Sequence, residues 1–411
     1  MPKAIIITID QLSARYLSPY GNTWNPTPEL DNLAAIGMTA EYCLSSTTCL
    51  DSSMRSLLTG QHAISTEARP TLMRQLEEKG QTSLLIQEGD SLTNVFGCQE
   101  FTKIKTIPAA SSADMADSLE MTATAQFISL VMKELEQGLT HDLTWIHHSN
   151  LGVVWDAPFP CREQFFGEED PEVANIAQPP FGPLTNKNDP DEVMQIVHAY
   201  AAQVSVLDTC LGFLLDQIQT LAQNLRETTL LIITSPRSQA LGHHGGVGYE
   251  HSQPATDQLH VPLLITKFVP QASEEPKVTP FRNSELLQSE CINSTLEEWM
   301  TGQCHQKGPA SHRSLLPQLE SPGENITPLA QQFTLSKFTH DRLGILTPAW
   351  FALTTGGGDL RLYVKPDDRW ESNEIASRRN DILKAFETLF KSPSDLLAQE
   401  VNLPDSLHKK P

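Results

Sequence analysis

The chain lacks the features of disulfide-bonded, membrane-spanning and nucleic-acid-binding proteins. Its seven cysteines are scattered and form no C-x-x-C pair, which argues against a zinc knuckle or a redox motif. No apolar run approaches the roughly 20 residues that a membrane-spanning helix needs. Positive charge is scarce, and a formal net charge of −21 opposes binding to nucleic acid or to anionic membranes.

The N-terminus shows no signal-peptide pattern. Its apolar run is short and ends at Asp10, so residues 3–9 are typical of a strand buried on both faces. With no membrane segment and widely spaced thiols, we expect a cytoplasmic protein whose cysteines are free.

Buried strands alternate with helices through the first two thirds of the chain. Apolar residues recur three and four positions apart between Val193 and Ile218, which predicts one long amphipathic helix. Further helices are expected at 27–37, at 51–60 with Asp51 or Ser52 as the cap, at 71–79 and at 118–137, and strands at 3–9, 82–86, 143–147, 229–234 and 261–266. This alternation predicts an α/β fold with a central, mostly parallel sheet covered by helices on both faces.

The last third has a different composition. Residues 267–340 are rich in Pro, Ser, Gln and Glu, which favours connecting segments with short helices. An apolar stretch at 343–353, a glycine turn at 356–358, a strand at 360–364 and a helix at 375–391 predict a small C-terminal α+β subdomain. We therefore divide the chain into a main domain, 1–300, and a connecting segment with this subdomain, 301–411.

Short motifs then occur in a fixed order along most of the chain. They are Ile7-Thr8-Ile9-Asp10, Tyr20-Gly21-Asn22, Thr27-Pro28-Glu29-Leu30-Asp31, Tyr200–Asp208, Val261–Ile265, Ser314–Pro317 and Thr347-Pro348-Ala349-Trp350. As an ordered set they resemble the sulfatase family of the alkaline-phosphatase superfamily. The resemblance implies that family's α/β fold, although fold alone does not supply function.

The resemblance also implies a cation site at which this chain departs from the family. Sulfatases hold a divalent cation, usually calcium, through two successive aspartates on the first strand and an Asp-Asn or Asp-His pair after a later strand. Here the first pair is Asp10-Gln11, and the later pair falls at Ser235-Pro236. Because calcium takes six to eight oxygen ligands, several of them anionic, one carboxylate makes a poor site.

The nucleophile and the cationic clamps are also altered. Sulfatases convert a Cys or Ser within Cys-x-Pro-x-Arg to formylglycine, and ungapped counting places Leu50 at the nucleophile and Met54 at the arginine. The family's Lys-x-His clamp falls on Glu88 and Asp90, which would repel sulfate or phosphate. The positions lost together are Gln11, Leu50, Met54, Glu88, Asp90, Ser235 and Pro236.

Several neighbouring residues keep functional groups, and each has two readings. Cys49 can be a reactive thiol or a packing residue, and Asp51 can be a helix cap or a displaced nucleophile, with Arg55 beside it. His147, at the end of strand 143–147, is the histidine that survives, unless His148 takes its place. Asp10 can be a residual metal ligand or can pair with Arg15 or Arg55.

A histidine-rich loop offers a different metal site. His243 and His244 open this loop, and His251 closes it. If they face Asp10, their imidazoles can bind zinc. The metal-ligand candidates are therefore Asp10, Gln11, Ser235 and His244.

Three hypotheses follow. The first is a sulfatase-fold pseudoenzyme with a binding or regulatory role and no cofactor, whose partner is an unknown small molecule or protein and neither nucleic acid nor membrane. The second is a repurposed hydrolase of sulfate or phosphate esters that uses Asp10, Asp51 or Cys49 with His147 and the loop 243–251 around zinc or manganese. If any divalent cation binds, calcium, magnesium or zinc is expected. The third is a regulator that pairs with an active paralogue. The sequence leaves the ligand and the oligomeric state open.

Overall fold

The computed structural model of the chain describes residues 2–110, 114–167, 169–184, 189–248, 253–271, 273, 277–303, 309–324, 326–339, 342–355, 357–398 and 400–409.

A mixed, mostly parallel sheet forms the centre of the molecule. Its strands follow the order β10-β2-β11-β7-β1-β5-β3-β4, with β12 pairing with β2. Strands β1, β5, β7, β3 and β4 run parallel, and β11 is antiparallel to β7 and β2. The bounds are β1 Lys3–Ile9, β2 Met38–Leu44, β3 Ser83–Glu88, β4 Lys103–Ile107, β5 Leu143–His148, β7 Thr229–Thr234, β10 His260–Val261, β11 Leu263–Phe268 and β12 Phe281–Gln288.

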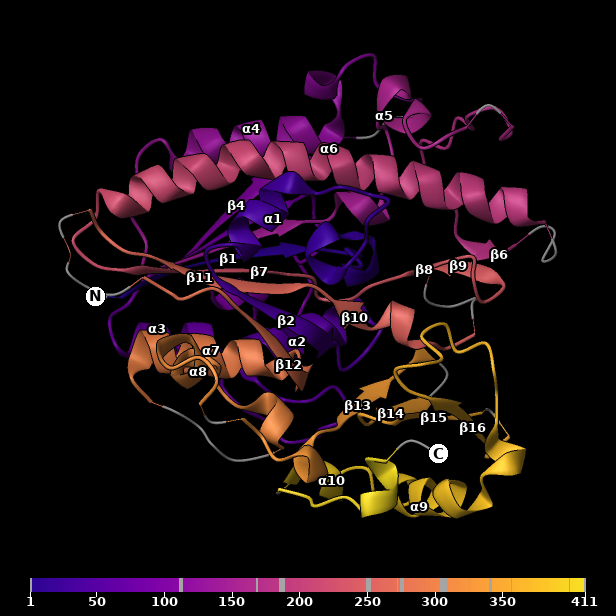
Figure 1. The fold of residues 1–411 in the computed structure, drawn as a ribbon. Coiled ribbons are helices and arrows are strands. Elements are labelled where there is room, and N and C mark those ends of the chain that lie inside the picture. Colours follow the sequence, from indigo (N-terminus) through magenta and orange to yellow (C-terminus); the bar gives the residue numbers. More distant parts are fainter. Residues whose placement is uncertain are drawn as a thin grey trace.

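Helices cover both faces of this sheet, as the alternation of elements predicts. Figure 1 shows α4 and α6 on one side and α3, α7 and α8 on the other. The first core lies between the sheet and helices α4 and α6, and the second between the sheet and helices α3, α7 and α8. In β1, Ile5 packs into the first core and Ile6 into the second, so its near-continuous apolar run contributes to both. The bounds are α1 Pro28–Ala34, α2 Leu50–Thr59, α3 Leu72–Glu78, α4 Ala123–Leu135, α5 Phe159–Glu163, α6 Pro190–Gln223, α7 Glu290–Thr301 and α8 Leu316–Glu320.

A second, antiparallel sheet lies at the C-terminal end with α9 and α10 beneath it (Figure 1). It consists of β13 Thr334–Lys337, β14 Leu343–Leu346, β15 Trp350–Thr354 and β16 Leu360–Val364, and the helices are α9 Asn380–Phe390 and α10 Asp395–Ala398. A small third sheet joins β6 Gly182–Pro183, β8 Ala240–Leu241 and β9 Gly246–Gly248.

The long amphipathic helix expected from the sequence is α6, and it extends further at both ends than the periodic residues do. It is long and apolar enough to cross a membrane by composition, but 78% of its most apolar window is buried inside the protein. Its apolar residues belong to the first core, which explains their number.

Two expectations were wrong at the level of elements. The polar segment 267–340 contains β12 and α7, an 8-residue strand and a 12-residue helix, rather than short helices alone. The helix expected to be capped by Asp51 or Ser52 is capped two or three residues earlier, by Cys49, so Asp51 lies inside its first turn.

Candidate functional site

Three strand ends meet at one edge of the central sheet. Thr8 of β1 lies opposite His147 of β5 and Thr234 of β7, so the residues that follow these strands are neighbours. The backbone N–H of Asp10 donates to the carbonyl of His148 at 2.9 Å, which fixes Asp10 at this edge. In open α/β sheets this edge is where ligands bind.

The carboxylate of Asp10 is held by an arginine that the sequence analysis did not assign to it. Arg237 donates from Nε to Oδ1 at 2.9 Å and from Nη2 to Oδ2 at 3.0 Å, so both carboxylate oxygens are engaged. A third donor of the same guanidinium reaches the carbonyl of Thr48 at 3.2 Å. Both side chains are buried, with 4% of Asp10 and 8% of Arg237 exposed. The expected partners, Arg15 and Arg55, were wrong.

The other expected cation ligands are committed to the loop that carries Arg237. The hydroxyl of Ser235 donates to the carbonyl of Arg237 at 2.5 Å, and the backbone N–H of Gln11 donates to the same carbonyl at 3.1 Å. The carbonyl of Pro236 accepts from the hydroxyls of Ser45, at 2.7 Å, and Ser53. These bonds hold residues 235–237 in the path that delivers the guanidinium to Asp10.

Gln11 has an uncommon backbone conformation and lies next to the segment that contains Gly152. Its φ of 64° lies in the left-handed region, which non-glycine residues rarely adopt. The Tyr200 hydroxyl donates to its carbonyl at 2.8 Å. Its side-chain nitrogen lies so close to Gly152 that a Cβ on that glycine would be 2.5 Å away, and the same Cβ would be 3.6 Å from Oδ2 of Asp10. The backbone at Gly152 therefore packs close to the Asp10 carboxylate.

The segment that the resemblance assigns to the nucleophile lies mostly in α2. Leu50 begins α2 and packs against the second core, and Met54 is 1% exposed within that core. Asp51 is exposed and lies near Cys98, whose pKa burial raises, with a further contribution from Asp51, to about 12. Arg55 donates to the carbonyl of Ala63 at 3.2 Å. Cys49 is exposed at the helix N-cap.

The position of the lost cationic clamp holds a buried acid–histidine pair. Oε2 of Glu88 lies 2.8 Å from Nδ1 of His148 and accepts the backbone N–H of Ser149 at 3.1 Å. Burial alone would raise the pKa of Glu88, but His148 and Ser149 lower it on balance. Glu88 is thus a structural partner of His148, whereas Asp90 is exposed. The pair supplies no free positive charge.

His147, the surviving histidine, is neutral and buried. Its Nδ1 lies 2.9 Å from the Thr8 hydroxyl, while its Nε2 has no hydrogen-bond partner among the described residues. Burial lowers the pKa of His147 to about 4, although the Asp10 charge opposes this. At neutral pH the ring therefore cannot act as a cationic clamp.

The loop histidines lie in a second cluster of charged groups. Nε2 of His244 is 3.9 Å from Oδ2 of Asp257 and 3.9 Å from Oε2 of Glu371, and the ring of His243 stacks on Trp370 at 5.3 Å. These contacts of the two rings are therefore with Asp257, Glu371 and Trp370 and not with Asp10. His251 lies outside the described residues. Within the described ranges, no group of three or more His, Cys, Asp or Glu side chains is placed to hold a metal ion.

The comparisons with known proteins agree with this geometry at the level of family and fold. A family model described as Sulfatase matches residues 2–279. The chain belongs to the sulfatase family. No curated protein matches this sulfatase-family chain.

Solved structures extend the fold similarity to the whole molecule. The phosphonate monoester hydrolase of Agrobacterium radiobacter gives a TM-score of 0.75 at 15% identity, covering 97% of each chain. The phosphonate monoester hydrolase from Silicibacter pomeroyi gives 0.71 at 14%, covering 97% of this chain and 96% of the other. A protein of Bacteroides fragilis named as a sulfatase gives 0.67 at 16%, covering 96% of each. At these identities the similarity shows the fold of the family, with its mixed sheet and C-terminal strands.

A divalent cation of the kind that the family uses does not fit the residues of this member. Asp10 has both oxygens bonded to Arg237, Ser235 donates its hydroxyl to a carbonyl, and Pro236 has no side-chain donor. The residue missed by sequence reasoning is Arg237. It stands directly after the two altered ligand positions, and a positive side chain beside a lost cation site was the available signal.

Proposed function

We propose that this sulfatase-family protein is a non-catalytic binding or regulatory protein, a pseudoenzyme of its family. The observation that carries the proposal is the ion pair between Asp10 and Arg237, in which a guanidinium takes the carboxylate that the family uses for a cation.

The ion pair opposes cation binding on energetic grounds. For a cation to reach Asp10, Arg237 must leave both carboxylate oxygens, and breaking a buried pair of this kind typically costs about 3–5 kcal/mol. The entering ion would then find one carboxylate, the neutral Gln11 and Ser235, and the closed backbone at Gly152. Six to eight oxygen ligands are not available there.

The nucleophile and the cationic clamp of the family also have no counterpart at the positions that the resemblance assigns to them. Leu50 has no group that can attack sulfur or phosphorus, and neither it nor a neighbour matches the formylglycine motif. Glu88 and the neutral His147 leave no positive clamp for a sulfate or phosphate. Because catalytic groups act as a unit, loss of the central ones lowers turnover by several orders of magnitude.

Turnover assays test the proposal. Purified protein is incubated with 4-nitrophenyl sulfate, 4-nitrophenyl phosphate and a phosphonate monoester, each with calcium, magnesium, manganese or zinc, and an active sulfatase serves as the positive control. We expect release of 4-nitrophenol at the rate of buffer alone. Metal-dependent turnover that Asp10→Asn abolishes, and that Asp90→Asn at an exposed carboxylate leaves unchanged, would refute the proposal and favour the repurposed hydrolase.

A further inference from the structure

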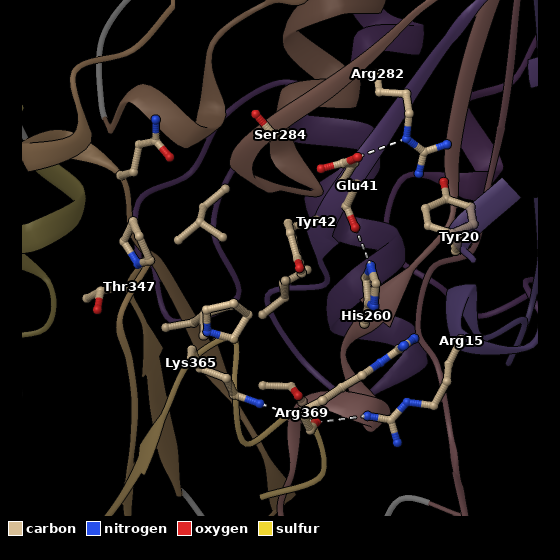
Figure 2. A pocket seen from close by; sticks show the side chains of 17 residues that line it. Arg15, Tyr20, Glu41, Tyr42, His260, Arg282, Ser284, Thr347, Lys365 and Arg369 are labelled. Atoms are coloured by element: carbon tan, nitrogen blue, oxygen red, sulfur yellow. Dashed lines mark hydrogen bonds and ion pairs between the residues drawn. The ribbon is translucent and has the colours of Figure 1, made fainter. Parts of the chain in front are cut away.

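A cavity of about 410 Å³ lies between the edge of the central sheet and the C-terminal sheet. One side comes from β2, β10 and β12 through Tyr42, His260 and Leu286, and the other from the segments around Thr347 and Lys365. Figure 2 shows Tyr42 and His260 on one side of this space and Thr347 and Lys365 on the other. The volume falls within the range of about 300–1,000 Å³ that is typical of small-molecule sites. Neither Asp10 nor Arg237 lines it.

The cavity lining is basic, although the chain carries a formal net charge of −21. Four cationic side chains line it, Arg15, Arg282, Lys365 and Arg369, against one carboxylate, Glu41. Four cations around one cavity of an otherwise acidic protein favour the binding of small anions in that cavity.

Three of these cations already have acidic partners. Arg282 pairs with Glu41 at 2.8 Å, Arg15 lies 3.8 Å from Asp257, and Lys365 pairs with Glu371. Arg369 forms no ion pair with any carboxylate of the described ranges, and its guanidinium is 5.9 Å from the centre of the Trp370 ring. Among the described residues, Arg369 is therefore the one cation of the lining without an acidic partner.

The segment that carries Arg369 is anchored. Its backbone carbonyl accepts from Nη2 of Arg15 at 3.4 Å and from Nζ of Lys365 at 3.3 Å, and both of these donors are buried. Arg15 also stacks its guanidinium 4.1 Å from the centre of the Trp370 ring. The backbone at Arg369 is therefore fixed before any ligand arrives, which lowers the entropy lost on binding.

His260, which also lines the cavity, is uncharged at neutral pH. Burial is the main factor that lowers the pKa of His260 to about 4, and Arg15, Arg369 and Lys365 lower it further against a hydrogen bond to the carbonyl of Glu41. At neutral pH this ring adds no positive charge of its own. The ring of Tyr42 stacks on it at 5.8 Å and is 39% exposed.

The rest of the lining is largely apolar, with Leu44, Leu286, Leu346, Pro348 and Pro366 beside the Tyr42 ring. We propose that the cavity binds a small organic monoanion, in which a carboxylate or sulfate ester group pairs with Arg369 and an apolar ring packs against Tyr42 and these side chains. A guanidinium matches both oxyanions through two parallel hydrogen bonds, and the single unpaired charge favours a monoanion over a dianion. This goes beyond the proposed function, because it involves none of the residues around Asp10.

Calorimetric titration tests the site with defined probes. The probes are 2-naphthoate and 2-naphthyl sulfate as monoanions, 2-naphthyl phosphate as the more highly charged analogue and 2-naphthamide as the neutral one. We expect both monoanions to bind the wild-type protein with one site and the amide to bind at least tenfold more weakly, because a charged hydrogen-bonded pair is typically worth a factor of about ten or more. The two monoanion titrations also show which oxyanion the cavity prefers.

Variants locate the binding. Arg369→Gln should weaken both monoanions about tenfold, and Ser284→Trp, at an exposed lining position, should block them without removing a charge. Arg378→Gln, an exposed arginine of the same subdomain outside the lining, is the matched control and should bind as the wild type does. Melting curves of each variant confirm that it is folded.

The proposal is overturned if the monoanions do not bind, if the amide binds equally well, or if Arg369→Gln and Ser284→Trp leave affinity unchanged. Release of 2-naphthol is followed in the same samples. Hydrolysis of the sulfate would contradict the pseudoenzyme proposal but leave the proposed anion site in the cavity unaffected. If no probe binds, the anion site is contradicted and the pseudoenzyme proposal is unaffected.

Discussion

At the scale of single residues, the carboxylate of Asp10 accepts one hydrogen bond on each oxygen from Arg237. A planar guanidinium matches a carboxylate better than any other side chain, and it stays charged when buried. It therefore compensates the negative charge at the end of β1 that a divalent cation compensates in active members of the family.

A double-mutant cycle measures this pairing. We expect Arg237→Gln to lower the free energy of unfolding by about 3 kcal/mol, because it leaves a buried carboxylate without its partner. Asp10→Asn combined with Arg237→Gln should be less destabilising than the sum of the single changes, since each single variant buries a lone charge and the double variant buries none. Urea unfolding of the four proteins gives the coupling energy, and strictly additive effects would show that the pair contributes nothing.

At the scale of elements, the N-terminus of α1 shows where local sequence rules end. Thr27, where the sequence predicts this helix to begin, is at the N-cap, but its side chain makes no capping bond within the helix. The carboxylate of Asp208, on α6, accepts the N–H groups of Glu29 and Leu30 at 3.1 and 3.0 Å instead. The acceptor comes from 178 residues further along the chain, which no local pattern can show.

The central strands were predictable for a clear reason, whereas β12 was not. Strand β1 is buried on both faces, so its isoleucine run stands out in the sequence. Strand β12 has a mixed, polar sequence and pairs with β2 through an irregular register between Asn283 and Leu286. Because its identity depends on pairing with a distant strand, composition alone assigned it to a connecting segment.

The residue types at the family's site positions could be read from the sequence, whereas the partner of Asp10 could not. Counting from the family motifs located the altered positions, and the strand register confirms that the ends of β1, β5 and β7 meet. Which arginine reaches Asp10 depends on the path of the loop 235–237, which is set by hydrogen bonds from Ser45 and Gln11. Those bonds join segments that are distant in sequence.

At the scale of the whole molecule, buried titratable groups give stability a definite pH dependence. Burial lowers the pKa of His62, His147 and His260 to about 4 in the folded protein. Between pH 4 and 6.5 the unfolded chain then binds more protons than the folded one, so these histidines make stability rise with pH. Burial raises the pKa of Glu290 to about 7, and this group makes stability fall as pH rises from 4.5 to 7.

Two variants separate these opposing contributions. Relative to the wild type, Glu290→Gln should gain stability as pH rises from 4.5 to 7, by up to about 3 kcal/mol, because the amide carries no charge to bury. His147→Gln should lose stability relative to the wild type as pH rises from 4 to 6.5, by a similar amount. Urea unfolding at several pH values measures both, and curves parallel to the wild type would contradict the burial of these groups.

Calcium titration of the wild-type protein shows whether Arg237 has taken the place of the family's cation. We expect no saturable binding up to about 10 mM calcium, a concentration above the dissociation constants of the weakest protein calcium sites. Binding of one calcium ion per chain that is lost in Asp10→Asn would contradict it.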